Sequence, residues 1–198
     1  MGDLTGRPAA RRRGRPAVEP PEVGAAAQDA EPDPESVARA IVLRRLTGAA
    51  QSRAQLADAL ARRDVPEGVA TRVLDRFTEV GLIDDQEYAH MLVRSRHAER
   101  GLSRRALAVE LRRKGIDDET AAVALEGVDD EDEEHAAREL VRRRLRTTAA
   151  LERDVRVRRV YGALARKGYP GGLVSRLVRE ELAAEGSDDE DAPDDGTL

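Results

Sequence analysis

The chain has 198 residues, of which 37% are charged and only 2% aromatic, and its formal net charge is −5. It contains no cysteine, which excludes disulfides, thiolate nucleophiles and zinc–thiolate sites. No apolar run approaches the roughly 20 residues of a bilayer-spanning helix, and the first residues lack the apolar stretch of a signal peptide. We therefore expect a cytoplasmic protein that makes no contact with a membrane.

Charge is unevenly distributed along the chain. Residues 36–184 carry 29 basic and 25 acidic residues, and seven of those acids lie between Glu126 and Glu134. The remainder of this region is therefore strongly basic, which favours a polyanion or an acidic protein surface as partner. The alternative is a mixed, solvated helix surface with no role in binding.

Both ends of the chain are predicted to be disordered tails. Residues 1–35 are rich in Pro, Ala and Gly, and residues 185–198 carry seven acids and no basic residue. The N-terminal tail contains Arg13-Gly14-Arg15-Pro16, which is similar to the core of AT-hook segments that enter the minor groove of DNA. A simple basic patch is the competing interpretation of this short pattern.

The region between the tails is internally repetitive. Leu, Val, Ile and Ala recur there at spacings of three and four residues, which is typical of amphipathic helices, and no strand pattern is present. The landmarks of residues 56–74 recur after a shift of 51 residues and again after a further 53. We predict an all-α fold of three tandem three-helix repeats, at residues 36–83, 84–128 and 129–184, which form an elongated, curved array.

Several residues mark the ends of the predicted helices. Ser52 with Gln55, and Asp84 with Glu87, have the spacing of a capping box, so a helix should begin after each pair's first member. Left-handed residues that end the second helices are expected at Asp64, Gly115 and Gly168, and helix starts at Pro66, Asp117 and Pro170.

No catalytic constellation is evident in the sequence. It lacks a phosphate-binding loop and a dinucleotide-type glycine run. The three histidines have no carboxylate at ligand spacing, and the acids from Asp129 to Glu134 suit a helix N-terminus better than a magnesium site. We therefore expect a protein that is not an enzyme and that holds no metal or cofactor.

The candidate binding residues are basic. A basic pair recurs in each of the three repeats, at Arg62-Arg63, Arg113-Lys114 and Arg166-Lys167. Two explanations are open: stabilisation of the helix end through its dipole, or binding of a partner. Denser clusters in the second and third repeats favour contact with a polyanion or a partner. The predicted partner-binding or DNA-binding residues are Arg94, Arg96, Arg100, Arg104, Arg105, Arg112, Arg113, Lys114, Arg142, Arg143, Arg156 and Arg159.

The middle repeat carries a specific signature. It consists of Gly81-Leu82-Ile83-Asp84-Asp85, Tyr88-Ala89, Arg94, Arg100-Gly101 and Glu110-Leu111-Arg112-Arg113-Lys114-Gly115-Ile116. This signature resembles that of the RecX family of bacterial recombination regulators, and the likeness extends over about residues 36–184. It implies an all-helical regulator that binds the RecA nucleoprotein filament, inhibits its ATPase and strand-exchange activities in DNA repair and the SOS response, and can bind DNA.

We expect this regulator to be a monomer that contacts single- or double-stranded DNA through largely non-specific electrostatics. Two other functions remain open at this point. A three-helix unit can carry a helix-turn-helix, as in a DNA-binding transcriptional regulator, although no helix shows the pattern of a base-reading helix. The chain could also be a helical scaffold for another acidic protein.

Overall fold

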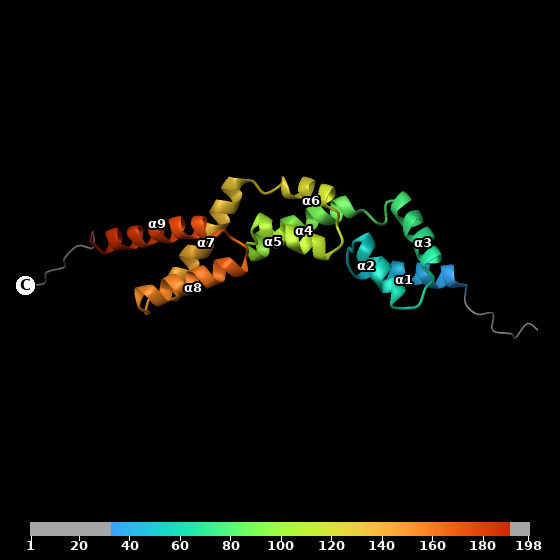
Figure 1. Cartoon of the computed structure of the whole chain (residues 1–198), viewed down its shortest axis with the longest axis horizontal. Coiled ribbons are helices and arrows are strands. Elements are labelled where there is room, and N and C mark those ends of the chain that lie inside the picture. The colour runs from blue at the N-terminus through green and yellow to red at the C-terminus, as the bar shows by residue number, and fades with distance from the viewer. Residues whose placement is uncertain (1–32, 191–198) are drawn as a thin grey trace, which may run out of the picture. The chain divides into compact units, whose positions relative to one another are not determined.

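A computed structural model describes residues 33–190, which form nine α-helices and no β-strand (Figure 1). The helices are α1 (Pro34–Gly48), α2 (Arg53–Ala61), α3 (Glu67–Glu79), α4 (Asp85–Arg100), α5 (Arg104–Arg113), α6 (Asp118–Leu125), α7 (Asp130–Thr147), α8 (Arg153–Arg166) and α9 (Gly171–Glu190). The prediction of an all-α chain is confirmed.

Each consecutive set of three helices has its own hydrophobic core. Leu56 and Leu60 of α2 pack with Phe77 in the first core. The equivalent leucines of the second core are Leu107 and Leu111 on α5, both fully buried. Each core combines apolar stripes from its three helices, because helices of this length are marginal in water without such burial. The three predicted three-helix repeats are therefore confirmed.

The predicted helix starts are also observed. Ser52 and Gln55 form the complete capping box, with bonds in both directions. The Asp84 carboxylate accepts the Glu87 backbone N–H at 2.9 Å and so caps α4. The Glu87 carboxylate pairs instead with Arg94 at 3.1 Å, so the second half of this predicted box is replaced by a surface ion pair.

A left-handed residue ends the second helix of each repeat, as predicted. Asp64, Gly115 and Gly168 have φ angles of 57°, 75° and 88°. Asparagine and aspartate tolerate this conformation better than other residues with a β-carbon, which explains why Asp64 can stand where the other repeats have glycine.

The two later glycines have a second role, because they lie where one repeat meets the preceding one. A β-carbon added to Gly115 would lie 2.2 Å from the Ala54 β-carbon on α2. One added to Gly168 would lie 2.5 Å from Ser103 Oγ and 2.9 Å from the Ala106 β-carbon on α5. The end of α5 thus presses against the first turn of α2, and the end of α8 presses against the first turn of α5. Only glycine leaves enough room at these two contacts.

Hydrogen bonds join the same helix ends. The Ser52 hydroxyl donates to the Lys114 carbonyl, and the Ser103 backbone N–H donates to the Lys167 carbonyl at 3.0 Å. Each junction therefore pairs the first turn of one helix with a carbonyl at the end of another, which is favourable for both helix dipoles.

A carboxylate from the following repeat completes each junction. Asp85 of α4 accepts the Arg53 backbone N–H at 2.8 Å, and Glu133 of α7 accepts the Arg104 backbone N–H at 3.1 Å. The two junctions are therefore built from equivalent residues, and we call them the repeat junctions.

The structure corrects the predicted boundaries of both tails. Helix α1 begins at Pro34, which we had assigned to the N-terminal tail, because proline fits the first turn of a helix. Helix α9 continues to Glu190, beyond the predicted boundary at residue 184. Its Glu185 carboxylate pairs with the Arg156 guanidinium at 2.7 Å, which holds this part of α9 against α8. The Arg13–Pro16 segment and residues 191–198 lie outside the described residues.

Replacing Gly115 by alanine should destabilise the protein by at least ~2 kcal/mol, because the methyl group overlaps Ala54 and also strains the left-handed backbone. Gly81 offers a matched control, since its φ is 72° but an added β-carbon meets no atom within 4 Å. Gly81→Ala should cost only ~1 kcal/mol. Equilibrium urea unfolding measures both values, and equal costs would show that close approach at the junction is unimportant.

Candidate partner-binding surface

A groove of about 930 Å³ is lined by residues from all three repeats. Helices α2 and α5 supply much of its wall, together with residues at the end of α8. Its basic lining residues are Arg45, Arg62, Arg100, Arg105, Arg113, Lys114 and Arg166, and its acidic ones are Asp58 and Glu110. We call this the basic groove.

The basic groove contains the first member of every recurring basic pair. Arg62, Arg113 and Arg166 occupy equivalent positions at the ends of α2, α5 and α8, and all three line it. The second member also has a backbone role in two of the repeats, since the carbonyls of Lys114 and Lys167 belong to the repeat junctions, and of the second members only Lys114 lines the groove as well. The pairs thus combine a structural backbone role with side chains that face the groove.

The charge of the groove is cationic. Glu110 is engaged by Arg96 at 3.0 Å, which compensates one of the two carboxylates in the lining. The guanidinium groups of Arg100, Arg105 and Arg113 form no ion pair with a carboxylate of residues 33–185. Leu102, Ala106 and Val109 add apolar surface, and Val109 is 39% exposed. This mixture of cations and apolar atoms suits an acidic protein surface.

Four of the predicted binding residues meet in this groove: Arg100, Arg105, Arg113 and Lys114. The prediction did not include Arg45, Arg62 and Arg166. The recurring basic pairs were the signal for Arg62 and Arg166. Arg45 had no comparable signal, because the sequence does not show that the last turn of α1 reaches α2 and α5.

Four other predicted residues form ion pairs at the surface of the second repeat. Arg94 pairs with Glu87 and Arg96 with Glu110, while Arg104 pairs with Asp130 at 3.3 Å and Arg112 with Asp118 at 3.7 Å. The Arg96–Glu110 pair is partly buried, whereas the other three are exposed; exposed pairs contribute little to stability, so a partner can compete for Arg94, Arg104 and Arg112 at small cost.

Two predicted residues hold the third repeat together. Arg142 donates to Glu181 at 2.7 Å and to Glu139 at 3.2 Å. Arg156 is largely buried and donates to Glu185 at 2.7 Å and to the Leu145 carbonyl at 3.3 Å. Their guanidinium groups are therefore engaged in packing α7 and α8 against α9.

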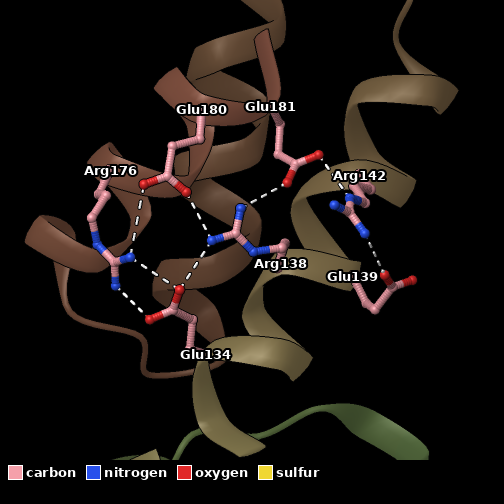
Figure 2. Close-up of polar contacts among 7 residues, drawn as sticks. All are labelled: Glu134, Arg138, Glu139, Arg142, Arg176, Glu180 and Glu181. Atoms are coloured by element: carbon pink, nitrogen blue, oxygen red, sulfur yellow. Dashed lines mark hydrogen bonds and ion pairs between the residues drawn. The ribbon is translucent and has the colours of Figure 1, made fainter. Parts of the chain in front are cut away.

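Arg142 belongs to a network between α7 and α9 (Figure 2). Arg138 lies at its centre and binds Glu134, Glu180 and Glu181 at 2.7–3.0 Å. Arg176 binds Glu134 at 2.6 Å. Burial raises the pKa of Glu181, but hydrogen bonds from Arg142 and Arg138 outweigh this effect and the pKa is lowered.

The last two predicted residues, Arg143 and Arg159, lie outside the groove and the network. Arg143 lines a small hollow with Arg144 and Lys167, and Arg159 lines a neighbouring one with Arg158. Burial lowers the pKa of Lys167, and the positive charges of Arg143, Arg100 and Arg144 lower it further. This part of the third repeat therefore has a strongly positive potential.

Within residues 33–190, no group of three His, Asp or Glu side chains is placed to hold a metal ion. In the same part of the chain, no helix is long and apolar enough to cross a membrane.

Comparison with known proteins identifies all three repeats. Models of the first, second and third three-helix domains of RecX match residues 38–77, 84–125 and 131–178. The regulatory protein RecX of Thermobifida fusca is 56% identical over 160 residues, which cover 80% of this chain and 86% of the relative. That of Streptomyces lividans is 53% identical over 172 residues, 86% of this chain and 92% of the relative.

A solved structure has the same fold. The crystal structure of RecX from Lactobacillus salivarius matches with a TM-score of 0.66 and 21% identity, over 75% of this chain and 96% of that one. The sequence relatives are regulatory proteins, which favours the predicted regulator over an enzyme, a transcription factor or a general scaffold.

The network in Figure 2 predicts a pH dependence of stability. Hydrogen bonds from Arg176 and Arg138 lower the pKa of Glu134 to about 2, from 4.5. The folded-state pKa is thus depressed, so the stabilisation is complete above about pH 4.5 and is lost as the pH falls toward 2. Urea unfolding between pH 7 and pH 3 should show the difference between wild type and Glu134→Gln shrinking with acidification.

Glu131→Gln is the control for this experiment. Glu131 is an exposed acid in the first turn of α7, three residues before Glu134, and it forms no ion pair with the described residues. Its replacement should give a much smaller difference from wild type across this pH range. A Glu134→Gln difference that stays constant with pH would contradict the role assigned to the network.

Proposed function

The chain belongs to the RecX family of regulatory proteins, and from this membership we propose that it binds the RecA nucleoprotein filament and modulates its ATPase and strand-exchange activities. The observation that carries the proposal is the recurrence of an exposed arginine at equivalent positions of the three repeats. Arg62, Arg113 and Arg166 all line the basic groove. A repeated set of cations suits a partner that is itself a polymer of identical subunits and phosphates.

The basic groove supplies the chemistry for the protein part of this contact. Its cations complement acidic side chains, and Leu102, Ala106 and Val109 provide apolar surface to be covered. Because Arg105 and Arg113 have no carboxylate partner among residues 33–185, the carboxylates of a binding partner do not have to displace ion pairs within that part of the chain.

DNA is the second proposed partner. The unpaired cations of the third repeat, including Arg143 and Arg159, supply a sequence-independent attraction for phosphates that weakens as salt rises. We propose that the chain acts as a monomer in the cytoplasm, where the filament assembles on DNA. This assignment rests on the proposed partner.

The test is an ATP-turnover assay of RecA on single-stranded DNA with increasing amounts of the full chain. Arg105→Glu/Arg113→Glu should raise the concentration needed for half-maximal modulation by ~10-fold or more, because two groove contacts become repulsive. Far-ultraviolet circular dichroism and melting should be unchanged, since both side chains are exposed.

The matched control is Arg44→Glu/Arg63→Glu, which reverses two exposed arginines of the first repeat that lie outside the groove. It should leave the modulation within about twofold of wild type, the level expected for surface charges without a contact. Equal losses in the two variants would show a response to net charge alone and would overturn the groove as the contact. Absence of any effect of the wild-type chain on RecA would overturn the proposed function.

A further inference from the structure

The third repeat contains a hollow whose charged lining is entirely cationic. Its volume is about 340 Å³ and it lies between α7 and α8. Four arginines line it together with Thr147, Thr148 and Gly162: Arg144, Arg158, Arg159 and Arg166. We call it the arginine hollow. None of these guanidinium groups forms an ion pair with a carboxylate of residues 33–185.

The lack of partners here contrasts with other arginines on the same helices. Arg138 and Arg142 on α7 and Arg156 on α8 each bind at least one glutamate. The carboxylates that form these pairs lie on α7 itself or on α9. The four guanidinium groups of the hollow are exposed to solvent and lack a carboxylate partner among residues 33–185, so their combined positive charge favours the binding of an external anion.

Gly162 determines how much room the hollow has on the side of α8. It lies inside α8, where glycine is less favourable than alanine for the helix. A β-carbon added at this position would lie 3.5 Å from Arg166 Nη1 and would extend into the hollow. Glycine thus leaves space beside the guanidinium groups, and the conformation of the helix does not require it.

The surroundings add to the positive potential. The adjoining hollow is lined by Arg143, Arg144 and Lys167, and burial together with nearby arginines lowers the pKa of Lys167. Arg144 lines both hollows, and Arg166 lines both the arginine hollow and the basic groove. The three hollowed regions therefore adjoin one another.

We propose that the arginine hollow is a binding site for a phosphate group of a nucleic-acid backbone. Planar guanidinium groups match phosphate oxygens in pairs of parallel hydrogen bonds, and several of them around one hollow fix the phosphate in place. The inference rests on the proposed DNA contact and names its location. In this proposal the arginine hollow contacts phosphate, and the adjoining basic groove contacts the protein part of the filament.

The experiment uses the full chain without RecA and a fluorescein-labelled single-stranded oligonucleotide, whose anisotropy is measured over a range of salt concentrations. Arg158→Gln/Arg159→Gln should weaken binding ~10-fold or more, the loss typical of two phosphate contacts. The slope of log K against log salt should fall by about 1.4, or about 0.7 for each lost contact with a single strand. Arg39→Gln/Arg76→Gln removes the same charge from the first repeat, where both arginines are already paired with glutamates, and should change affinity by less than about twofold.

A pair of glycine variants tests the shape of the hollow with no change in charge. Gly162→Ala should raise or preserve the melting temperature, because alanine favours a helix, and should still weaken oligonucleotide binding severalfold. Gly68→Ala in α3 is the matched control, since its added β-carbon would also lie near an arginine, 3.7 Å from Arg72 Nη1. It should change stability in the same direction and leave binding unaltered.

Each contrary outcome has a distinct meaning. Equal losses from the two arginine variants, or unchanged binding in the hollow variants, would overturn the arginine hollow while the proposed DNA contact stands. Failure of the wild-type chain to bind the oligonucleotide would overturn both. In that case, a melting shift with inorganic pyrophosphate that is lost in Arg158→Gln/Arg159→Gln would assign the hollow to a free phosphate compound.

Discussion

The close contact between the ends of successive second helices is the constraint on which the stacking of the repeats depends. Gly115 and Gly168 allow that contact, because no β-carbon fits against Ala54 or Ser103. The junction places the first turn of one helix, with its unpaired N–H groups, beside a carbonyl at the end of the next. Asp85 and Glu133 each accept one backbone N–H of that first turn. Backbone groups that would otherwise lack partners at buried helix ends are thus satisfied between repeats.

Each terminal repeat forms one junction and lacks, on its outer side, the features that would form another. The first repeat has Asp64 in the left-handed position, which is tolerable because no earlier repeat presses against it. In the third repeat, Arg156 stands at the position equivalent to Ser52 and Ser103, and α8 begins one turn earlier than α2 and α5, at Arg153. The Arg156 guanidinium donates to the Glu185 carboxylate and to the Leu145 carbonyl. Groups of the third repeat itself therefore occupy the place where a junction with a further repeat would form. Such terminal units end a stack of repeats, as polar caps do in other repeat proteins.

Local features of the fold could be predicted from the sequence, whereas contacts between distant residues could not. Capping at Ser52 and Asp84 and the left-handed Asp64 follow from chemistry within a few residues, and they were predicted. The close approach at Gly115 could not be predicted, because Ala54 lies far away in the sequence. The adjacent residues Arg142 and Arg143 illustrate the same limit for the candidate site. Arg142 binds Glu181 on α9, whereas Arg143 lines a hollow with other cationic side chains. Nothing in their immediate sequence distinguishes the two arginines.

The repeat junctions also explain why the basic groove exists. At the ends of α5 and α8, one residue supplies a carbonyl to the junction while the arginine before it lines the groove, as Arg113 does beside Lys114. In the third repeat, the carboxylates that pair with Arg138, Arg142 and Arg156 lie on α7 itself or on α9. The arginines of α7 and α8 in the arginine hollow are consequently left without a carboxylate partner among the side chains that the structure describes. The same packing that stabilises the repeats therefore determines which cations remain for a partner, and a change at a junction should alter the groove even when every groove side chain is retained.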